Sequence, residues 1–505
     1  MLNLKETDIV DFEDAYHDMV RRYENEQSNH KYSIEYYKQL IRMMQKKLYG
    51  ASADHIEIKG MFNEVEVEAA EEEKTEAPAT KVEGHTRKKA IRKPLPEYLP
   101  RKEIVYDLSA EEKLCNCCNQ EMRKIGEETS EQLDLIPAHI EVLRHIRYKY
   151  ACSGCDGSIK KALMAKQAIP KSNAGPGLLA HLIVSKYQDA LPLYRQEEIL
   201  KRIGIDLSRA VMASWMIKIA ELVLPLLNLM REDLFSGEII KCDETKVRVL
   251  KRDGLKVEGN SFMWVMSNWQ KDRSIVLFEY DPTRSSAVPL RLFSEFSGYL
   301  QVDGYDAYNA VTKIAPIKRV GCFAHVRRKF TDCINSLKQN DRKKHSGFEA
   351  IKFIKKLYEI EDKIKNATID EKKEARKIEA IPILDGFRLW ILQKIIEVPP
   401  KSVYGRALAY ANNEWVYLIR YIEHGALRPD NNLAENAIRP FVIGRKNWLF
   451  SDTEKGAQAS AALYSLVETA KANGLEPYAY MRDVIEKIPT AQSLEDFEKL
   501  LPYRK

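Results

Sequence analysis

The sequence predicts a multidomain α/β protein, and three observations lead to this fold class. The chain has 505 residues, 45% of them hydrophobic, so it is long enough for several domains with cores of their own. The hydrophobic spacing changes from helical to strand-like at Gly237, and strands then alternate with helices. Two Cys-x-x-Cys pairs separated by 33 residues mark a further, smaller unit.

Four segments are expected before the strands begin. Apolar and aromatic residues at steps of three and four predict a helix in residues 1–50, which either pairs with a second copy as a coiled coil or packs on its own chain. Charge blocks and prolines predict a linker over residues 51–100, whose basic stretch 87–93 either lies on phosphates or stays solvated. Residues 101–160 hold the cysteine pairs, and residues 161–236 are mostly helical.

Helices are expected at residues 177–188, 194–203 and 208–232 of the helical segment. Ser208 is placed as the N-cap of the second helix of a helix-turn-helix, so the segment is expected either to bind DNA or simply to pack. Pro225 interrupts the most apolar run of the chain and predicts a kink or break there.

Strands and helices alternate in residues 237–475, the largest expected domain. In chain order we expect strands at 239–250, 261–269 and 274–280, a helix at 285–296, a strand at 298–303, a short helix from Tyr305 and a strand at about 319–323. Three antiparallel strands, a crossover helix, a fourth strand, a helix and a fifth strand describe the ribonuclease-H-like α/β fold.

A helical insertion is expected inside this domain, at about residues 330–425, because that stretch is strongly charged and has little strand signal. After Pro429 the pattern indicates a short helix, a segment at 441–450 and a helix of small residues at 454–471. Gly474 ends that helix, and residues 476–505 form a C-terminal region.

The two cysteine pairs have the spacing of a closed, structural zinc site, since each pair lies on one tight turn and two such turns give four thiolates. Their members are Cys115, Cys118, Cys152 and Cys155. Cys117 is an alternative ligand in the first pair, and four unpaired buried thiols are the alternative to a metal site. The other cysteines are expected to be ordinary core residues: Cys242, Cys322 and Cys333.

Three carboxylates lie on separate expected elements. Asp243 is in the middle of the first strand, Asp303 ends the fourth, and Glu435 lies on the short helix after Pro429. Because the first and fourth strands are neighbours in this fold, the carboxylates would meet at one rim and could hold two hard divalent ions. The alternatives are a turn at Asp303, a cap or salt bridge at Asp243, and a pair between Glu435 and Arg439.

Six short motifs surround these residues. They are Asp243-Glu244-Thr245, Val302-Asp303-Gly304-Tyr305, residues 321–330 (GCFAHVRRKF), residues 431–440 (NNLAENAIRP), residues 444–448 (GRKNW) and residues 473–480 (NGLEPYAY). With them the chain resembles, over nearly its whole length, the transposases of the insertion sequence 66 family of bacterial mobile elements.

The resemblance implies that Asp243, Asp303 and Glu435 form a DDE triad that binds Mg²⁺ or Mn²⁺, with two ions in the site. It implies a catalytic domain that cleaves DNA strands at the element ends and joins them to target DNA. The partners it implies are double-stranded DNA, further copies of the chain in a synaptic complex, and accessory proteins of the same element.

Basic residues near the triad are candidates for gripping DNA phosphates, and contacts of that kind would make binding salt-dependent. They are His325, Arg328, Arg439, Arg445 and Lys446. His325 has a second interpretation, packing or hydrogen bonding near the fifth strand, and Trp448 either stacks on a base or belongs to the core.

Two other functions remain open from the residues alone: a catalytically silent DNA-binding protein derived from a transposase, and a metal-dependent nuclease of the same fold. The formal net charge of +6 only permits a polyanionic partner. No run approaches 18 apolar residues and no secretory signal is visible, so we expect a cytoplasmic bacterial protein without a membrane partner, associated with the nucleoid when bound to DNA.

Overall fold

The computed structural model describes residues 80–82, 85–87, 140–151, 159–161 and 163–504, apart from short gaps at 253, 257–258, 269–272, 314–315, 338–341 and 343–344. The described residues from Ile146 onward form one compact unit, and those between Ala53 and His145 belong to a second. The coiled-coil prediction for residues 1–50 lies outside the described residues.

Two small hairpins precede the main body. In the second unit, β1 (Thr80–Val82) pairs antiparallel with β2 (His85–Arg87), inside the segment expected to be a linker. In the first unit, β3 (Lys149–Ala151) pairs antiparallel with β4 (Ile159–Lys161). Cys152 and Cys155 belong to the connection between β3 and β4, outside the described residues.

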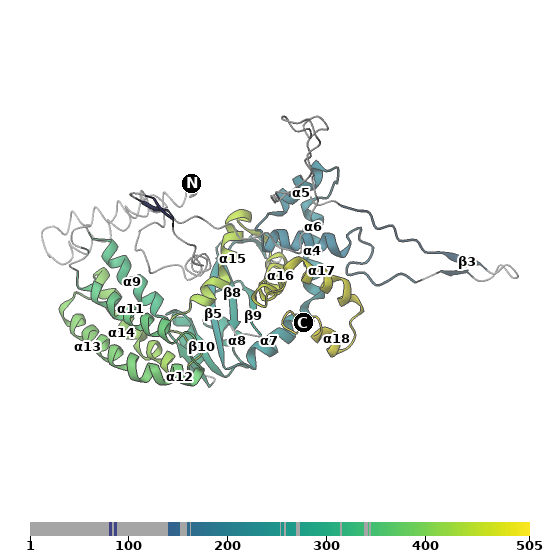
Figure 1. Cartoon of the computed structure of the whole chain (residues 1–505). Helices are drawn as coiled ribbons and strands as arrows, with labels where there is room; N and C mark the ends of the chain where they lie inside the picture. Colours follow the sequence, from purple (N-terminus) through teal and green to yellow (C-terminus); the bar gives the residue numbers. More distant parts are fainter. Residues whose placement is uncertain are drawn as a thin grey trace, which may run out of the picture. The chain divides into compact units, whose positions relative to one another are not determined.

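A five-stranded sheet lies at the centre of the first unit (Figure 1), with the strand order β11-β10-β5-β8-β9. Its strands are β5 (Ile239–Val247), β8 (Ser261–Asn268), β9 (Ile275–Asp281), β10 (Gly298–Gln301) and β11 (Ile317–Val320). The first three pair antiparallel, whereas β10 and β11 run parallel to β5. All five strands predicted from the sequence are therefore present, in the predicted chain order.

The pairing between β5 and β10 makes the segments that carry two of the predicted carboxylates neighbours. Lys241 pairs with Gln301 in this parallel ladder. Two positions beyond this pair, Asp243 is still inside β5, whereas Asp303 lies just past the end of β10.

The first predicted strand is longer than the strand in the structure. The chain leaves the central sheet after β5, and β6 (Val249–Arg252) joins a second sheet of order β12-β6-β7. The other members are β7 (Leu255–Lys256) and β12 (Ser451–Thr453). The sequence did not indicate the division between β5 and β6, because the residues of both strands favour β structure.

Helices before the sheet follow the prediction, including the break near Pro225. They are α4 (Pro176–Tyr187), α5 (Leu193–Arg202), α6 (Arg209–Leu222) and α7 (Leu224–Phe235). Ser208 caps α6, since its hydroxyl accepts a hydrogen bond from the amide of Val211. The predicted break falls at Val223, next to Pro225, and bends α6 and α7 by 51°.

Within the part of the chain that the structure describes, no helix by itself has the length and apolar character needed to cross a membrane. The bent pair α6–α7 meets those two criteria when its halves are taken together.

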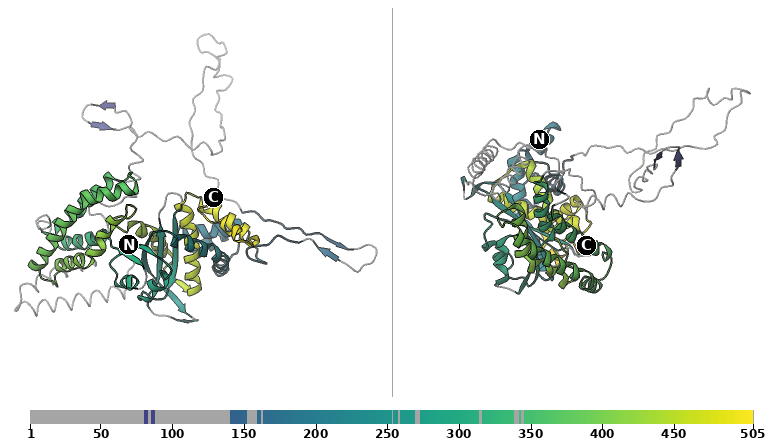
Figure 2. Two further views of the ribbon diagram at one scale, coloured as in Figure 1. Left: turned by 90° about the horizontal axis from the view of Figure 1, so that it is seen from below. Right: turned by 90° about the vertical axis from the view of Figure 1, so that its left-hand side faces the viewer.

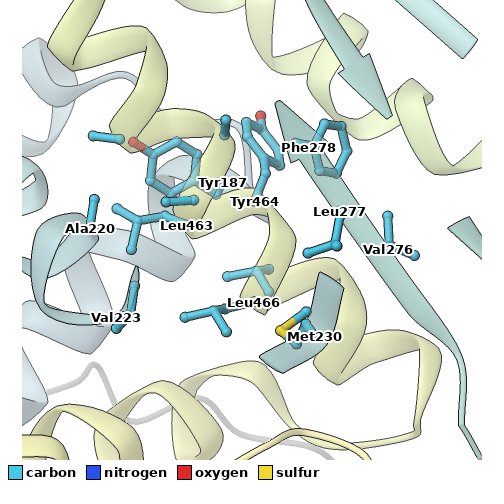
Figure 3. Close-up of a cluster of buried hydrophobic side chains, with 14 of the residues drawn as sticks. Tyr187, Ala220, Val223, Met230, Val276, Leu277, Phe278, Leu463, Tyr464 and Leu466 are labelled. Carbon is cyan, nitrogen blue, oxygen red and sulfur yellow. The ribbon is translucent and has the colours of Figure 1, made fainter. Parts of the chain in front are cut away.

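The small-residue helix α16 (Glu454–Ala472) packs against β9 and fills the core (Figure 3). Buried alanines along it, such as Ala461 and Ala462, allow the close approach, and Tyr464 packs edge-on against Tyr187 of α4. Gly474, with φ of +72°, follows the end of α16 as predicted.

The helices that follow β11 in the chain, up to Glu423, pack together at the β11 side of the sheet (Figures 1 and 2). They are α9 (Phe323–Asn335), α11 (Gly347–Lys363), α12 (Ile369–Ala375), the π-turn η3 (Arg376–Ala380), α13 (Ile381–Glu397), α14 (Val403–Leu418) and the 3₁₀ turn η4 (Ile419–Glu423). Buried Arg376 ties this group together through Glu361 and the carbonyls of Tyr421, His424 and Leu427.

The sequence led us to expect a short helix followed by a separate segment at 441–450, but the structure has one helix there. This helix, α15 (Asn432–Trp448), continues through Pro440. Proline removes one helical hydrogen bond, and the buried side chain of Phe441 on the sheet side holds the helix together across it. After α16 the chain ends with α17 (Pro477–Lys487), η5 (Ile488–Thr490) and α18 (Leu494–Glu498).

Candidate active site

Asp243 lies in β5, on the face of the sheet that α15 covers. Two residues further along, and therefore on the same face, the hydroxyl of Thr245 accepts a hydrogen bond of 3.1 Å from Arg445 of α15. A second hydrogen bond from Arg445 goes to the carbonyl of Lys246. Arg445 thus fixes α15 against β5 rather than extending into solvent.

Asp303 follows the end of β10, and its backbone and side chain are both held. Its carboxylate accepts a hydrogen bond of 3.0 Å from the amide of Tyr305, and its carbonyl accepts one of 2.8 Å from the guanidinium of Arg319. Arg319 is fully buried in β11 and also binds Asn309 and, at 2.5 Å, Glu414 of α14. The turn that presents Asp303 is therefore connected to the helical group.

Glu435 lies in the first turn of α15, where the helix start is fixed to β5. The side-chain amide of Asn431 donates to the carbonyl of Cys242 at 2.8 Å, and its backbone amide donates to the sulfur of Cys322 at 3.2 Å. Because Cys242 directly precedes Asp243, this contact brings the first turn of α15 to the residue that the sequence singled out.

The buried carboxylate of Asp243 is influenced by three other acids. Burial raises the pKa of Asp243 well above its ordinary value, and the negative charges of Glu244, Glu435 and Asp303 raise it further. One carboxylate oxygen of Glu435 is buried and finds no hydrogen-bond partner among the described residues. Crowded carboxylates with an unpartnered buried oxygen fit a divalent cation, which would compensate their charge.

Two predicted phosphate-contacting residues lie beside Glu435 instead of being free. Arg328 of α9 approaches one carboxylate oxygen at 3.2 Å, and Nδ1 of His325 lies 3.7 Å from the other. Burial lowers the pKa of His325 below its ordinary value, although the charge of Glu435 opposes this. Both residues follow the fifth strand on α9, as their order in the sequence predicted.

Glu244 is a residue that the sequence reading did not single out. It points to the opposite sheet face from Asp243 and is almost fully buried, with hydrogen bonds from Tyr308 and, at 2.7 Å, from Arg284. The same guanidinium lies 3.7 Å from the ring centre of Tyr305, whose amide binds Asp303. Two consecutive acids in a buried strand were the signal that could have identified it.

Arg439 and Lys446 are exposed on α15. With Glu435 they stand at i, i+4 and i+11, so they share one helix face. Trp448 is half-buried against Phe441 and Tyr464, with the ammonium of Lys186 4.3 Å from its ring centre. The sequence left two alternatives for Trp448, stacking on a base or belonging to the core. These contacts match the core alternative.

A cavity of about 410 Å³ opens elsewhere, between α7, β9 and α16. Arg231 and Arg291 both bind Glu279 at its wall, so each of these charged groups already has an ion-pair partner. None of the predicted site residues lines it.

The comparison with protein families places the chain in the class of transposases. The model described as the transposase IS66 family matches residues 171–459, more than half of the chain. The chain therefore belongs to the IS66 family, and the resemblance found in its motifs is confirmed.

Three further models match other parts. They are the zinc-finger binding domain of transposase IS66 at residues 112–156, the IS66 C-terminal element at 465–503, and a model described as Transposase C of IS166 homeodomain at 36–104. The first contains all four predicted zinc ligands and supports a structural zinc, although these cysteines lie outside the described residues. The last covers the whole of the expected linker and the end of the expected N-terminal helix.

Curated relatives come from Sinorhizobium fredii (strain NBRC 101917 / NGR234). Uncharacterized protein y4jD is 30% identical over 421 residues, which cover 81% of this chain and 81% of that protein. Uncharacterized protein y4qI is 30% identical over 486 residues, covering 92% and 88%. Uncharacterized protein y4hP is 28% identical over 457 residues, covering 86% and 82%. No solved structure matches the chain.

Proposed function

We propose that this chain is a DDE transposase that binds the ends of a bacterial insertion sequence and catalyses metal-dependent strand cleavage and strand transfer. The observation that carries the proposal is the meeting of Asp243, Asp303 and Glu435, which come from three separate elements. Membership of the IS66 family supports the same reaction class.

The domain that would hold this triad is proposed to be ribonuclease-H-like, spanning residues 237–475 with the helical insertion at about 330–425. In support, the sheet has three antiparallel strands followed by two parallel ones, in the order β11-β10-β5-β8-β9. The insertion lies between β11 and α15, the helix that contributes Glu435.

The triad would hold two Mg²⁺ or Mn²⁺ ions, because its three carboxylates offer the oxygen ligands that these hard cations require. When bound, such ions activate the attacking water or 3′-hydroxyl and stabilise the charge on the leaving oxygen. The role of the chain itself is positioning: the β5–β10 pairing makes the segments that carry the two aspartates neighbours, and Asn431 holds the first turn of α15 against β5.

DNA would lie along α15, since Arg439 and Lys446 are exposed on the same helix face as Glu435. Arg328 is more than half exposed and could exchange its contact with Glu435 for a phosphate. Arg445 already binds β5, which supports a structural role for that residue.

Other parts of the chain would serve recognition and assembly. The segment 161–236, with its capped helix α6, is proposed to bind the element ends, and residues 101–160 to fold around zinc. The zinc ligands proposed are Cys115, Cys118, Cys152 and Cys155. Assembly of several copies on DNA, with accessory proteins of the element, completes the proposal.

A strand-transfer assay with Mg²⁺ and labelled element-end DNA tests the reaction. Asp303→Asn should reduce both cleavage and strand transfer by about 100-fold or more, because the amide removes a charge that the metal site needs. The matched control is Asp306→Asn, three residues away in the same turn region and exposed, which should retain activity within about 2-fold of the unmodified chain.

The outcomes separate the proposal from its two rivals. Cleavage without joined products would identify a nuclease, and a gel shift without cleavage would identify a silent DNA-binding protein. Full strand transfer by Asp303→Asn would remove Asp303 from the site.

A further inference from the structure

A second set of metal-ligand residues lies beside the triad, at the start of α9. Cys322 is the N-cap residue of α9, and His325 lies in its first turn. One donor atom from each of these residues and one from Glu435 all lie within 4.8 Å of one another. A thiol, an imidazole and a carboxylate thus face the same small volume.

Two of these donor atoms lack the partners that buried polar atoms normally have. Nδ1 of His325 and one carboxylate oxygen of Glu435 are both buried, and neither makes a hydrogen bond with any described residue. They lie 3.7 Å apart, too far for a hydrogen bond between them. Two ligand atoms on one tetrahedral zinc lie about 3.5 Å apart, so this separation fits a shared ion.

The composition of the set determines which ion it would take. Mg²⁺ prefers oxygen ligands alone, whereas thiolate and imidazole ligands select borderline-soft ions such as Zn²⁺. Three protein ligands leave the fourth tetrahedral position to water. We propose that Cys322, His325 and Glu435 bind a transition-metal ion of the Zn²⁺ class, at a site separate from the four-cysteine unit. On binding, the thiol of Cys322 releases its proton to solvent.

The metal site also has a consequence for activity, and this consequence rests on the proposed function. Glu435 would belong both to the magnesium-binding triad and to the Cys322–His325 set, so one carboxylate serves two sites. An ion held by Cys322 and His325 would draw Glu435 away from the triad. Zn²⁺ should therefore inhibit the Mg²⁺-dependent reaction.

Direct binding is tested with Co²⁺, whose bonds to thiolate produce a charge-transfer absorption band. The full chain with its zinc finger already loaded is titrated with Co²⁺ in excess Mg²⁺. The unmodified chain should show the band at one added equivalent, and Cys322→Ser should lose it. His325→Gln, which retains the thiol of Cys322, should bind Co²⁺ about 10- to 100-fold more weakly than the unmodified chain.

Cys333→Ser is the matched control, because Cys333 is another buried free cysteine on α9 and is not one of the three ligands. It should retain the band, which shows that loss of a buried thiol does not itself abolish binding. Circular dichroism of each variant establishes that it is folded. A band of equal intensity in the unmodified chain and in folded Cys322→Ser overturns the site, since the cobalt would then be elsewhere.

The inhibition experiment measures the Zn²⁺ concentration that halves Mg²⁺-dependent DNA cleavage, with each variant normalised to its own rate without zinc. Cys322→Ser should need at least about 10-fold more Zn²⁺ than the unmodified chain. Equal sensitivity of the two proteins overturns the inhibition. If the chain binds Co²⁺ through Cys322 but cleaves no DNA, the metal site stands and the proposed transposase activity fails.

Discussion

The two edges of the central sheet are closed in different ways. At β9, short neutral side chains of α16 replace a neighbouring strand: Thr469 bonds to both the amide and the carbonyl of Val276, at 3.0 and 2.9 Å, and Ser465 accepts from the amide of Phe278 at 2.8 Å. The side-chain amide of Asn473 likewise accepts a hydrogen bond from the amide of Ser274 and donates one to its carbonyl. These bonds satisfy the exposed backbone of an edge strand.

At β11 the helical insertion closes the edge, and it uses backbone groups and buried charges. The amide of Gly321 donates to the carbonyl of Tyr417 at 2.9 Å, and Arg420 donates to the carbonyl of Arg319. The side chain of Arg319 joins Glu414 of the insertion to the backbone of Asp303. The β9 edge therefore serves the core, whereas the β11 edge also links the insertion to the candidate site.

The largest effect should come from Arg319→Met, which breaks the β11 connection. The free energy of unfolding should fall by about 3–5 kcal/mol, because Glu414 becomes a buried carboxylate without its partner. Urea unfolding followed by circular dichroism measures this change. The turn that presents Asp303 also loses a donor, so strand transfer should fall even under conditions where the variant is folded.

The double variant Arg319→Met with Glu414→Leu sharpens this test. Since no unpaired buried charge remains, it should recover much of the lost stability. Strand transfer should stay low, because the hydrogen bond to the carbonyl of Asp303 is still missing. Recovery of both stability and activity would show that the β11 edge, like the β9 edge, contributes to folding alone.

At the β9 edge, Thr469→Val should cost about 1–3 kcal/mol, because valine keeps the shape but leaves the amide and carbonyl of Val276 without partners. The control is Thr490→Val, whose hydroxyl bonds to Lys487 at the surface and whose loss should cost within about 0.5 kcal/mol. Urea unfolding compares the two. Equal costs would mean that α16 does not replace a strand through hydrogen bonds.

Sequence reasoning reached the strands and the carboxylates because both leave local signals. Strand-type residues alternate with turn residues from Gly237 onward, and an acid inside a buried strand, as at Asp243, is conspicuous. That Asp303 follows a strand paired with β5 is then expected from strand order. The residues of the candidate site could thus be predicted where the sequence of one strand or helix is itself unusual.

Contacts between distant segments could not be predicted in this way. Arg319 and Glu414 are 95 positions apart, and neither is unusual in its own segment. The turn of Arg445 toward β5 and the continuation of α15 through Pro440 likewise depend on what packs against them. Local propensity cannot specify such tertiary contacts.

The smallest effect concerns Lys186, a charged group near the α16 side of the sheet. Burial lowers the pKa of Lys186 from 10.5 to about 8, so between these pH values the unfolded chain binds more protons and stability rises with pH. The shift corresponds to at most ~3 kcal/mol. The ring of Trp448, 4.3 Å from the ammonium, favours the charged form and should reduce the effect to about 1 kcal/mol.

Lys186→Met should therefore be more stable than the unmodified chain at pH 7, and the difference should shrink as pH rises from 8 toward 10. Melting temperatures measured across this range test the sign. If the stability difference between Lys186→Met and the unmodified chain grew with pH, the folded protein would instead stabilise the ammonium of Lys186. Its positive charge would then contribute favourably to packing near α16.

A side chain at Gly304, next to Asp303, would force Tyr410 of α14 to move, because a Cβ there would lie 2.3 Å from the hydroxyl oxygen of Tyr410. The ring of Tyr410 therefore lies between α14 and the turn, so a shift of α14 would carry this ring toward or away from the turn. Any molecule that shifts the insertion would thereby alter where one aspartate stands relative to the other. A binding event on the helices would in this way reach the candidate site through contact alone.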